Sequence, residues 1–152
     1  MEAHGRLWDT LQDAGVSVNT NSKDCNDKID GYYHSRRQSV VVCQDNGVPG
    51  GEQVRWTAND LDTLRHEAQH VIQDCMVGSL GDMRSDTYFD REVLKEFLIN
   101  STLSADKLTS IVESYKEDGI SEEKIIMELE AFAVAKDVDP DTIARAVVRY
   151  CM

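Results

Sequence analysis

The sequence contains only two prolines, no long apolar run and no pair of cysteines spaced C-x-x-C. No window is apolar enough over enough residues to span a bilayer, so we expect no membrane partner. The first residues also lack the basic start and apolar core of a signal peptide, which predicts a cytoplasmic protein. The absence of C-x-x-C argues against a zinc knuckle built from cysteines.

Positive charge is scarce as well. Sixteen Lys and Arg residues stand against 28 Asp and Glu residues, which gives a formal net charge of −12. A surface of this sign repels phosphate backbones, so we expect no nucleic acid partner. Neutral or basic peptides would be better ligands. Acidity that serves only to keep the protein soluble is the simpler interpretation.

Four cysteines, Cys25, Cys43, Cys75 and Cys151, form an even set. An even count predicts a disulfide framework mainly in short secreted chains, a class that this sequence does not fit. We therefore expect buried, reduced thiols. A bridge between Cys25 and Cys43, which flank a predicted hairpin, stays open as an alternative.

The length of 152 residues fits one domain over residues 1–152 with a single core. Apolar spacing and turn residues predict one helix and three strands in the first half, at residues 2–14, 16–22, 28–33 and 38–45. A capping box of Thr57 and Asp60 predicts the start of the next helix. The helices expected from there on lie at residues 58–76, 90–100, 105–117, 122–137 and 140–150. Strands followed by helices, without alternation, indicate the α+β class.

The sequence HEAQH at residues 66–70 is the strongest functional signal. His66 and His70 are four residues apart on a predicted helix, so both rings can reach one metal ion. Zn²⁺ lowers the pKa of a bound water, and the neighbouring Glu67 can take its proton as general base and pass it to a leaving amine. A surface helix with an accidental histidine pair is the alternative interpretation.

A catalytic zinc requires a third protein ligand. The extended motif H-E-x-x-H-x-x-G-x-x-H is excluded, because Gln73 and Met76 stand where glycine and histidine are needed. On the helix predicted at 122–137, Glu130 has apolar neighbours, and a carboxylate in such surroundings needs a cation or another partner. Considered alone, a surface position would be more usual for Glu130. We expect the nearby Glu128 to be solvated, or at most to support a metal ligand without binding the metal itself.

The HEAQH helix and this later helix together resemble the gluzincins, the zincin branch whose third zinc ligand is a downstream glutamate. Glu128, Glu130, Ala131 and Ala135 match an E-x-E-A-x-x-x-A-like string in that family. The resemblance covers about half of the chain. It implies a minimal zincin-like fold and a zinc metallopeptidase acting on peptides or proteins, with Zn²⁺ on His66, His70 and Glu130.

The resemblance carries two further expectations. It implies that the strand at 38–45 is an edge strand that pairs with extended substrate, although three consecutive valines suit a sheet interior equally well. The chain is also similar to small zincin-like proteins of tailed phages, which would place it in the cytoplasm of an infected host.

Several supporting roles stay open. Asp74 could orient His70 or be solvated. The donor for the oxyanion that forms during peptide hydrolysis has four candidates, His34, Tyr88, Tyr115 and Tyr150. Two other functions compete with the peptidase. One is a catalytically silent zinc-binding protein that acts as a protein-interaction module, and the other is a metal-free helical interaction module.

Overall fold

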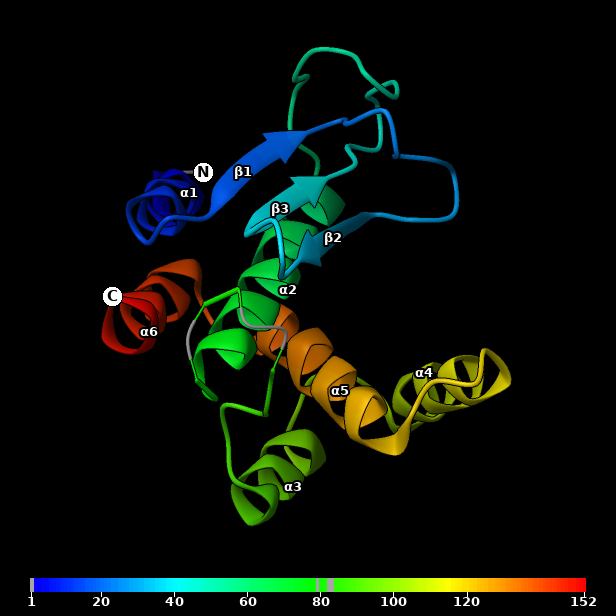
Figure 1. Cartoon of the computed structure of the whole chain (residues 1–152). Helices are drawn as coiled ribbons and strands as arrows, with labels where there is room; N and C mark the ends of the chain where they lie inside the picture. Colours follow the sequence, from blue (N-terminus) through cyan, green and yellow to red (C-terminus); the bar gives the residue numbers. More distant parts are fainter. Residues whose placement is uncertain (1, 79, 82–83) are drawn as a thin grey trace.

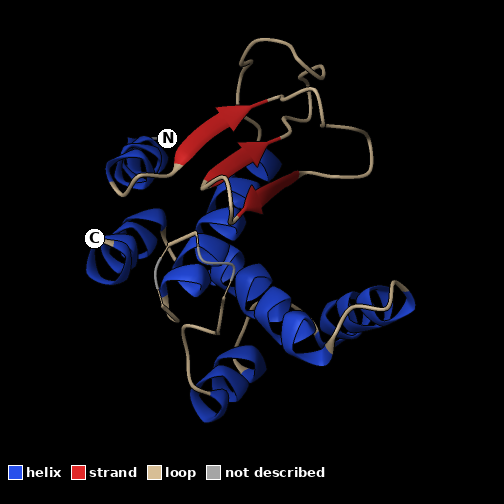
Figure 2. Cartoon of the chain, viewed as in Figure 1, coloured by secondary structure: helices blue, strands red, loops and turns tan. Residues whose placement is uncertain are grey.

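The computed structural model describes residues 2–78, 80–81 and 84–152 (Figures 1 and 2). Over these residues the chain forms six helices and one three-stranded sheet, which confirms the α+β class. The elements are α1 (Glu2–Asp13), β1 (Ser17–Thr20), β2 (Gly31–His34), β3 (Ser39–Val42), α2 (Ala58–Cys75), α3 (Arg91–Ile99), α4 (Ala105–Glu117), α5 (Glu122–Asp137) and α6 (Pro140–Cys151). None of the described helices combines the length and the apolar character needed to cross a membrane.

The sheet has the strand order β1–β3–β2. β1 runs parallel to β3 and β2 runs antiparallel to it, so that Val18 and Tyr33 both lie opposite Val40. The expectation of an edge strand at residues 38–45 is therefore wrong, because β3 has a neighbour on each side. The edge strand that faces the later helices is β2 (Figure 1).

Helix α2 is the central element of the fold. Its first turn has the predicted capping box, in which the Thr57 side chain accepts a hydrogen bond from the Asp60 amide and the Asp60 side chain accepts one from the Thr57 amide. The sheet, α5 and α6 all pack against α2 (Figure 1). Apolar side chains from α2 meet those of α1, β3 and α6 in one buried core, which includes Leu7, Leu11, Val40, Leu64, Val71, Ile72 and Val147. This packing holds the polar side chains of α2 in fixed positions.

Helix α5 packs against α2 and contains several buried small residues. Ala131, Ala133 and Ala135 are all buried. The guanidinium Nε of Arg65 donates to the carbonyl oxygen of Ala135 over 2.7 Å. The two helices that hold the predicted zinc ligands are therefore joined directly by packing and by hydrogen bonds.

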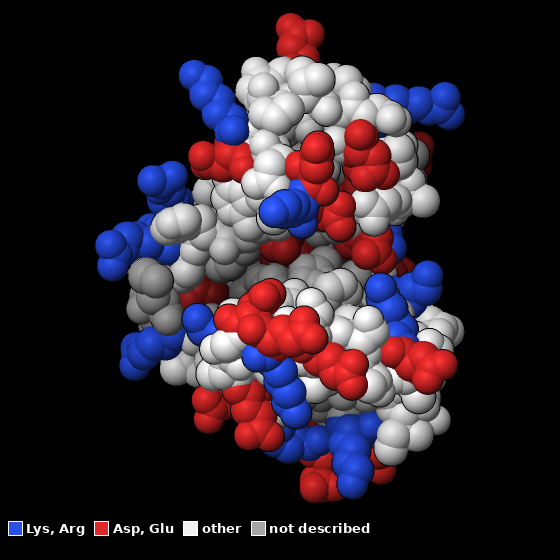
Figure 3. All heavy atoms as spheres, turned by 90° about the vertical axis from the view of Figure 1, so that its right-hand side faces the viewer, with Lys and Arg blue, Asp and Glu red and all other residues white. Residues whose placement is uncertain are grey.

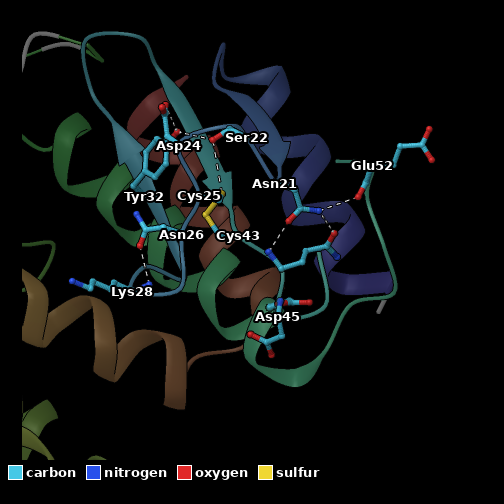
Figure 4. Close-up of a disulfide and its surroundings, with 12 residues drawn as sticks. Asn21, Ser22, Asp24, Cys25, Asn26, Lys28, Tyr32, Cys43, Asp45 and Glu52 are labelled. Atoms are coloured by element: carbon cyan, nitrogen blue, oxygen red, sulfur yellow. Dashed lines mark hydrogen bonds between the residues drawn. A yellow bond between two sulfur atoms is a disulfide. The ribbon is translucent and has the colours of Figure 1, made fainter. Parts of the chain in front are cut away.

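The four cysteines form two disulfides. Cys25 is bridged to Cys43, with Cα atoms 5.6 Å apart (Figure 4), and Cys75 is bridged to Cys151, with Cα atoms 5.3 Å apart. The expectation of reduced thiols is therefore wrong, and the bridge left open between Cys25 and Cys43 is present. Both Cα distances lie in the range that disulfide geometry requires. The second bridge ties the end of α2 to the end of α6.

We predict that the Cys75–Cys151 bridge contributes more to stability than the Cys25–Cys43 bridge. A disulfide restricts the unfolded chain more when it closes a longer loop, and the separations are 76 and 18 residues. Replacing Cys75 and Cys151 together by alanine should lower the free energy of unfolding by roughly 2–4 kcal/mol. Urea unfolding measures this loss, and the Cys25→Ala, Cys43→Ala protein is the control. An equal or larger loss in the control would contradict the prediction.

Candidate metal centre

His66 and His70 converge as the HEAQH motif predicts. Both lie on α2, and their Nε2 atoms are 3.1 Å apart. The two rings meet edge to face, with centroids 4.8 Å apart. The ring of His66 also packs against Phe132 of α5, with centroids 4.4 Å apart. Contacts within α2 and with α5 therefore hold both imidazoles toward one point.

Glu128 of α5 is the third group at this point. Its Oε2 lies 3.2 Å from the Nε2 atoms of both His66 and His70, and its Oε1 lies 2.9 Å from that of His70. Zinc–ligand bonds of 2.0–2.1 Å in tetrahedral geometry place neighbouring ligand atoms about 3.3 Å apart. The separations of the three side chains are close to this value, so the arrangement suits a tetrahedral ion with one position left for water.

Glu67 completes the group. Its side chain is buried, its Oε1 is 3.9 Å from the Nε2 of His66, and no described residue forms a hydrogen bond with its Oε2. Glu67, His66 and His70 each offer a ligand atom within 4.8 Å of the others. Burial raises the pKa of Glu67 although the two histidines oppose the shift. A buried carboxylate oxygen without a partner, next to two imidazoles and a second carboxylate, fits a site that receives a metal ion and its water.

The charges of the site also favour a cation. Burial by itself would lower the pKa of His70, but the hydrogen bond with Glu128 and the charges of Glu67 and Glu128 outweigh it and raise this pKa to about 9. Burial would raise the pKa of Glu128, yet its hydrogen bonds with His66 and His70 hold that pKa well below its usual range. At neutral pH without metal, a proton on His70 therefore balances Glu128, and a divalent ion would replace that proton.

Glu130, the predicted third ligand, lies elsewhere. Its carboxylate is fully buried and accepts four hydrogen bonds. The donors are Gln69 Nε2 at 2.9 Å, Gln73 Nε2 at 3.0 Å, and the backbone amides of Tyr88 at 2.8 Å and Phe89 at 3.1 Å. Both oxygens are thus occupied by N–H donors. Glu130, expected as a metal ligand, thus lies among N–H donors, and Glu128, expected to be solvated or at most to support a ligand, is the carboxylate beside the histidines.

Helical geometry explains why Glu128, and not Glu130, lies beside the histidines. Residues two apart on a helix point in nearly opposite directions, so Glu128 and Glu130 cannot both face the same pair of histidines. The apolar neighbours of Glu130 correctly indicated burial with a partner. That partner is a set of amide donors, because Gln69 and Gln73 lie on the part of α2 next to the histidines.

Asp74 does not orient His70. It accepts hydrogen bonds from the Tyr33 hydroxyl at 2.6 Å, the Ser35 hydroxyl at 2.9 Å and the Gly81 amide at 3.0 Å. The Nδ1 of His70 instead lies 2.7 Å from the Oε1 of Gln73. Gln73 is the neighbour of His70 that the sequence interpretation missed. Its position three residues after His70 was the available signal, since side chains at that spacing are neighbours on a helix.

Among the four candidate oxyanion donors, Tyr115 lies beside Glu128 of the candidate metal centre. Burial, together with the charge of Glu128 and a hydrogen bond to it, raises the pKa of Tyr115, so its hydroxyl stays protonated. Tyr88 and Tyr150 pack against each other, with centroids 5.5 Å apart. His34 lies at the end of β2, where its ring accepts a hydrogen bond from the backbone of the following turn.

A hollow of about 410 Å³ leads to these residues from the surface. Tyr32 and Tyr33 of β2 line one side, and Ile120, Lys124 and Met127 line the other. Figure 3 shows this face of the molecule, which is hollowed between the part that contains the sheet and the helices below it, with Asp and Glu side chains on both sides. The hollow reaches the metal centre, so a ligand lying along β2 would come within reach of it.

A comparison with known families places this architecture in context. A family described as "Domain of unknown function (DUF8637)" matches residues 2–152, a range that includes every residue of the candidate metal centre. No curated protein and no solved structure matches the chain. The description of the family states no activity, so the chemistry of the site carries the functional interpretation.

Proposed function

We propose that this chain, which belongs to the DUF8637 family, is a zinc-dependent metallopeptidase of minimal gluzincin type. One observation carries the proposal: the ring nitrogens of His66 and His70 and the carboxylate of Glu128 lie within 3.2 Å of one another. Two imidazoles and one carboxylate are a ligand set that suits Zn²⁺ and leaves a position for water.

The roles of the protein side chains follow from their places. A bound zinc ion supplies a water of lowered pKa. Glu67 would be placed to take a proton from this water, and its raised pKa would suit the return of that proton to a leaving amine. Tyr115 keeps its hydroxyl proton and donates a hydrogen bond to the carbonyl oxygen as negative charge develops there.

The substrate in this proposal is an extended peptide. β2 is an edge strand, and its residues Gly31, Tyr32 and Tyr33 line the hollow that reaches Glu67. A peptide can add to such an edge through backbone hydrogen bonds, which bind the main chain without selecting a sequence. The net charge of −12 would favour neutral or basic peptides.

The proposal is tested first by the metal content of the protein. The protein, purified without a histidine tag and incubated with zinc, should contain close to one zinc per chain by mass spectrometry. Glu128→Ala should retain much less, because a ligand is lost. Glu123→Ala, which removes an exposed carboxylate from the same helix, is the matched control and should retain zinc.

Two outcomes would contradict the proposal. The absence of zinc from all three proteins would leave the metal-free interaction module. Stoichiometric zinc in a protein that cuts no member of a peptide library would favour the catalytically silent zinc-binding protein.

A further inference from the structure

We propose that Gln73, held by Glu130, is a positioning residue that keeps a proton on Nδ1 of His70 and so directs the Nε2 lone pair of that ring to the metal. This inference deepens the proposed function, because it concerns the orientation of one of its ligands. The hydrogen bonds that carry it connect α2 and α5 behind the metal centre.

The first step concerns the orientation of the Gln73 amide. Its Nε2 lies 3.0 Å from Oε1 of Glu130 and 2.9 Å from the carbonyl oxygen of Met127. Both of these oxygens are acceptors. A carbonyl oxygen has no proton to donate, and the Glu130 carboxylate accepts four N–H groups. Turning the amide over would place its oxygen against two acceptors. The NH₂ group of Gln73 must therefore face α5.

The second step follows for the opposite end of the amide. With its NH₂ group toward α5, Gln73 presents Oε1 to His70, 2.7 Å from Nδ1. An amide oxygen can only accept, so Nδ1 of His70 must donate and hence carry a proton. Metal-binding histidines commonly have such an acceptor on the second ring nitrogen, and it determines which nitrogen is free for the ion.

The third step is the direction of the free nitrogen. Nε2 of His70 points to Nε2 of His66, 3.1 Å away, and to Oε1 of Glu128, 2.9 Å away. With Nδ1 directed to Gln73, Nε2 is the ring nitrogen that faces the other two ligands. Gln73 is almost fully buried, with 1% of its surface exposed, so water does not readily replace its oxygen.

The chain contains a matched control for Gln73. Gln69 is also buried on α2, and its Nε2 donates to the same oxygen of Glu130 over 2.9 Å. Gln69 makes no hydrogen bond to either histidine among those that the structure describes. Replacing either glutamine by methionine keeps the side-chain length and removes one donor from Glu130. Gln73→Met also removes the donor to the Met127 carbonyl oxygen, and it alone removes the acceptor for His70.

The experiment compares Gln73→Met with Gln69→Met by two measurements. In metal-free protein with ¹⁵N-labelled histidine, NMR should show that the Nδ1–H proton of His70 exchanges slowly with solvent in the wild type and in Gln69→Met, and much faster in Gln73→Met. Zinc affinity, measured by competition with a chelator, should fall about 10–100-fold in Gln73→Met and remain within about threefold of the wild type in Gln69→Met.

Equal changes in the two variants, or a Nδ1–H proton that exchanges as slowly in Gln73→Met as in the wild type, would overturn the inference. The wild-type NMR spectrum alone decides the case if Gln73→Met does not fold, because a His70 without a protected Nδ1–H proton refutes the hydrogen bond. A Gln73-dependent Nδ1–H signal in a protein that binds no zinc would support the hydrogen-bond chain and count against the proposed peptidase. The two proposals can therefore fail separately.

Discussion

Glu67→Gln is expected to bind zinc as the wild type does and to hydrolyse peptides about 10²–10⁴-fold more slowly. Oε1 of Glu67 lies 3.9 Å from Nε2 of His66, which is too far for it to hold the histidine in place. The amide keeps the shape of the side chain and cannot accept a proton. Initial rates on a casein or peptide library, with zinc content measured on the same samples, test this expectation.

Glu113→Gln is a suitable control for Glu67→Gln, because Glu113 is an exposed carboxylate on α4. It should leave both zinc content and hydrolysis unchanged. Full hydrolysis by zinc-loaded Glu67→Gln would contradict the mechanism. Hydrolysis that is absent from the wild type too would favour the silent zinc-binding protein.

Glu130→Ala is expected to lower the free energy of unfolding by at least about 3 kcal/mol, because four N–H donors lose their acceptor in a buried place and each unsatisfied donor costs about 1–3 kcal/mol. The measurement is urea unfolding in the presence of a chelator, since bound zinc would add its own stabilisation. Metal-free conditions separate the structural role of Glu130 from any effect on the metal.

Glu128→Ala provides the comparison under the same metal-free conditions. Its neighbour His70 can release the proton that balances Glu128 when the carboxylate is removed, so we expect a smaller loss of stability than in Glu130→Ala. A Glu130→Ala protein that is as stable as the wild type and has lost zinc would contradict this assignment and restore Glu130 as the ligand.

The sequence predicted most element boundaries because the signals for them are local. Helices α2, α4 and α5 begin at the predicted residues. Their N-caps are Thr57, Ser104 and Ser121, and Asp60 completes the capping box of α2. The arrangement of the strands was not predictable in this way. Three consecutive valines mark β3 as a strand, but its central place depends on β1 and β2, which pair with it from two other parts of the chain.

In the candidate site, too, the features set by local sequence were predictable and those set by contacts between distant elements were not. The approach of His66 to His70 follows from the geometry of one helix turn, so the motif alone predicts it. The choice between Glu128 and Glu130 depends on how α5 is rotated against α2, which no local pattern specifies. The Cys75–Cys151 bridge likewise depends on α6 returning to the end of α2.

That bridge determines what self-digestion of this protein would look like. Cys75 and Cys151 enclose the segment that contains α3, α4, α5 and nearly all of α6 in a covalent ring. A single cut anywhere between them opens the ring without releasing a fragment. Glu128 would remain tethered to the helix that carries His66 and His70, and the nicked molecule would migrate as one band until a reductant separated its two pieces.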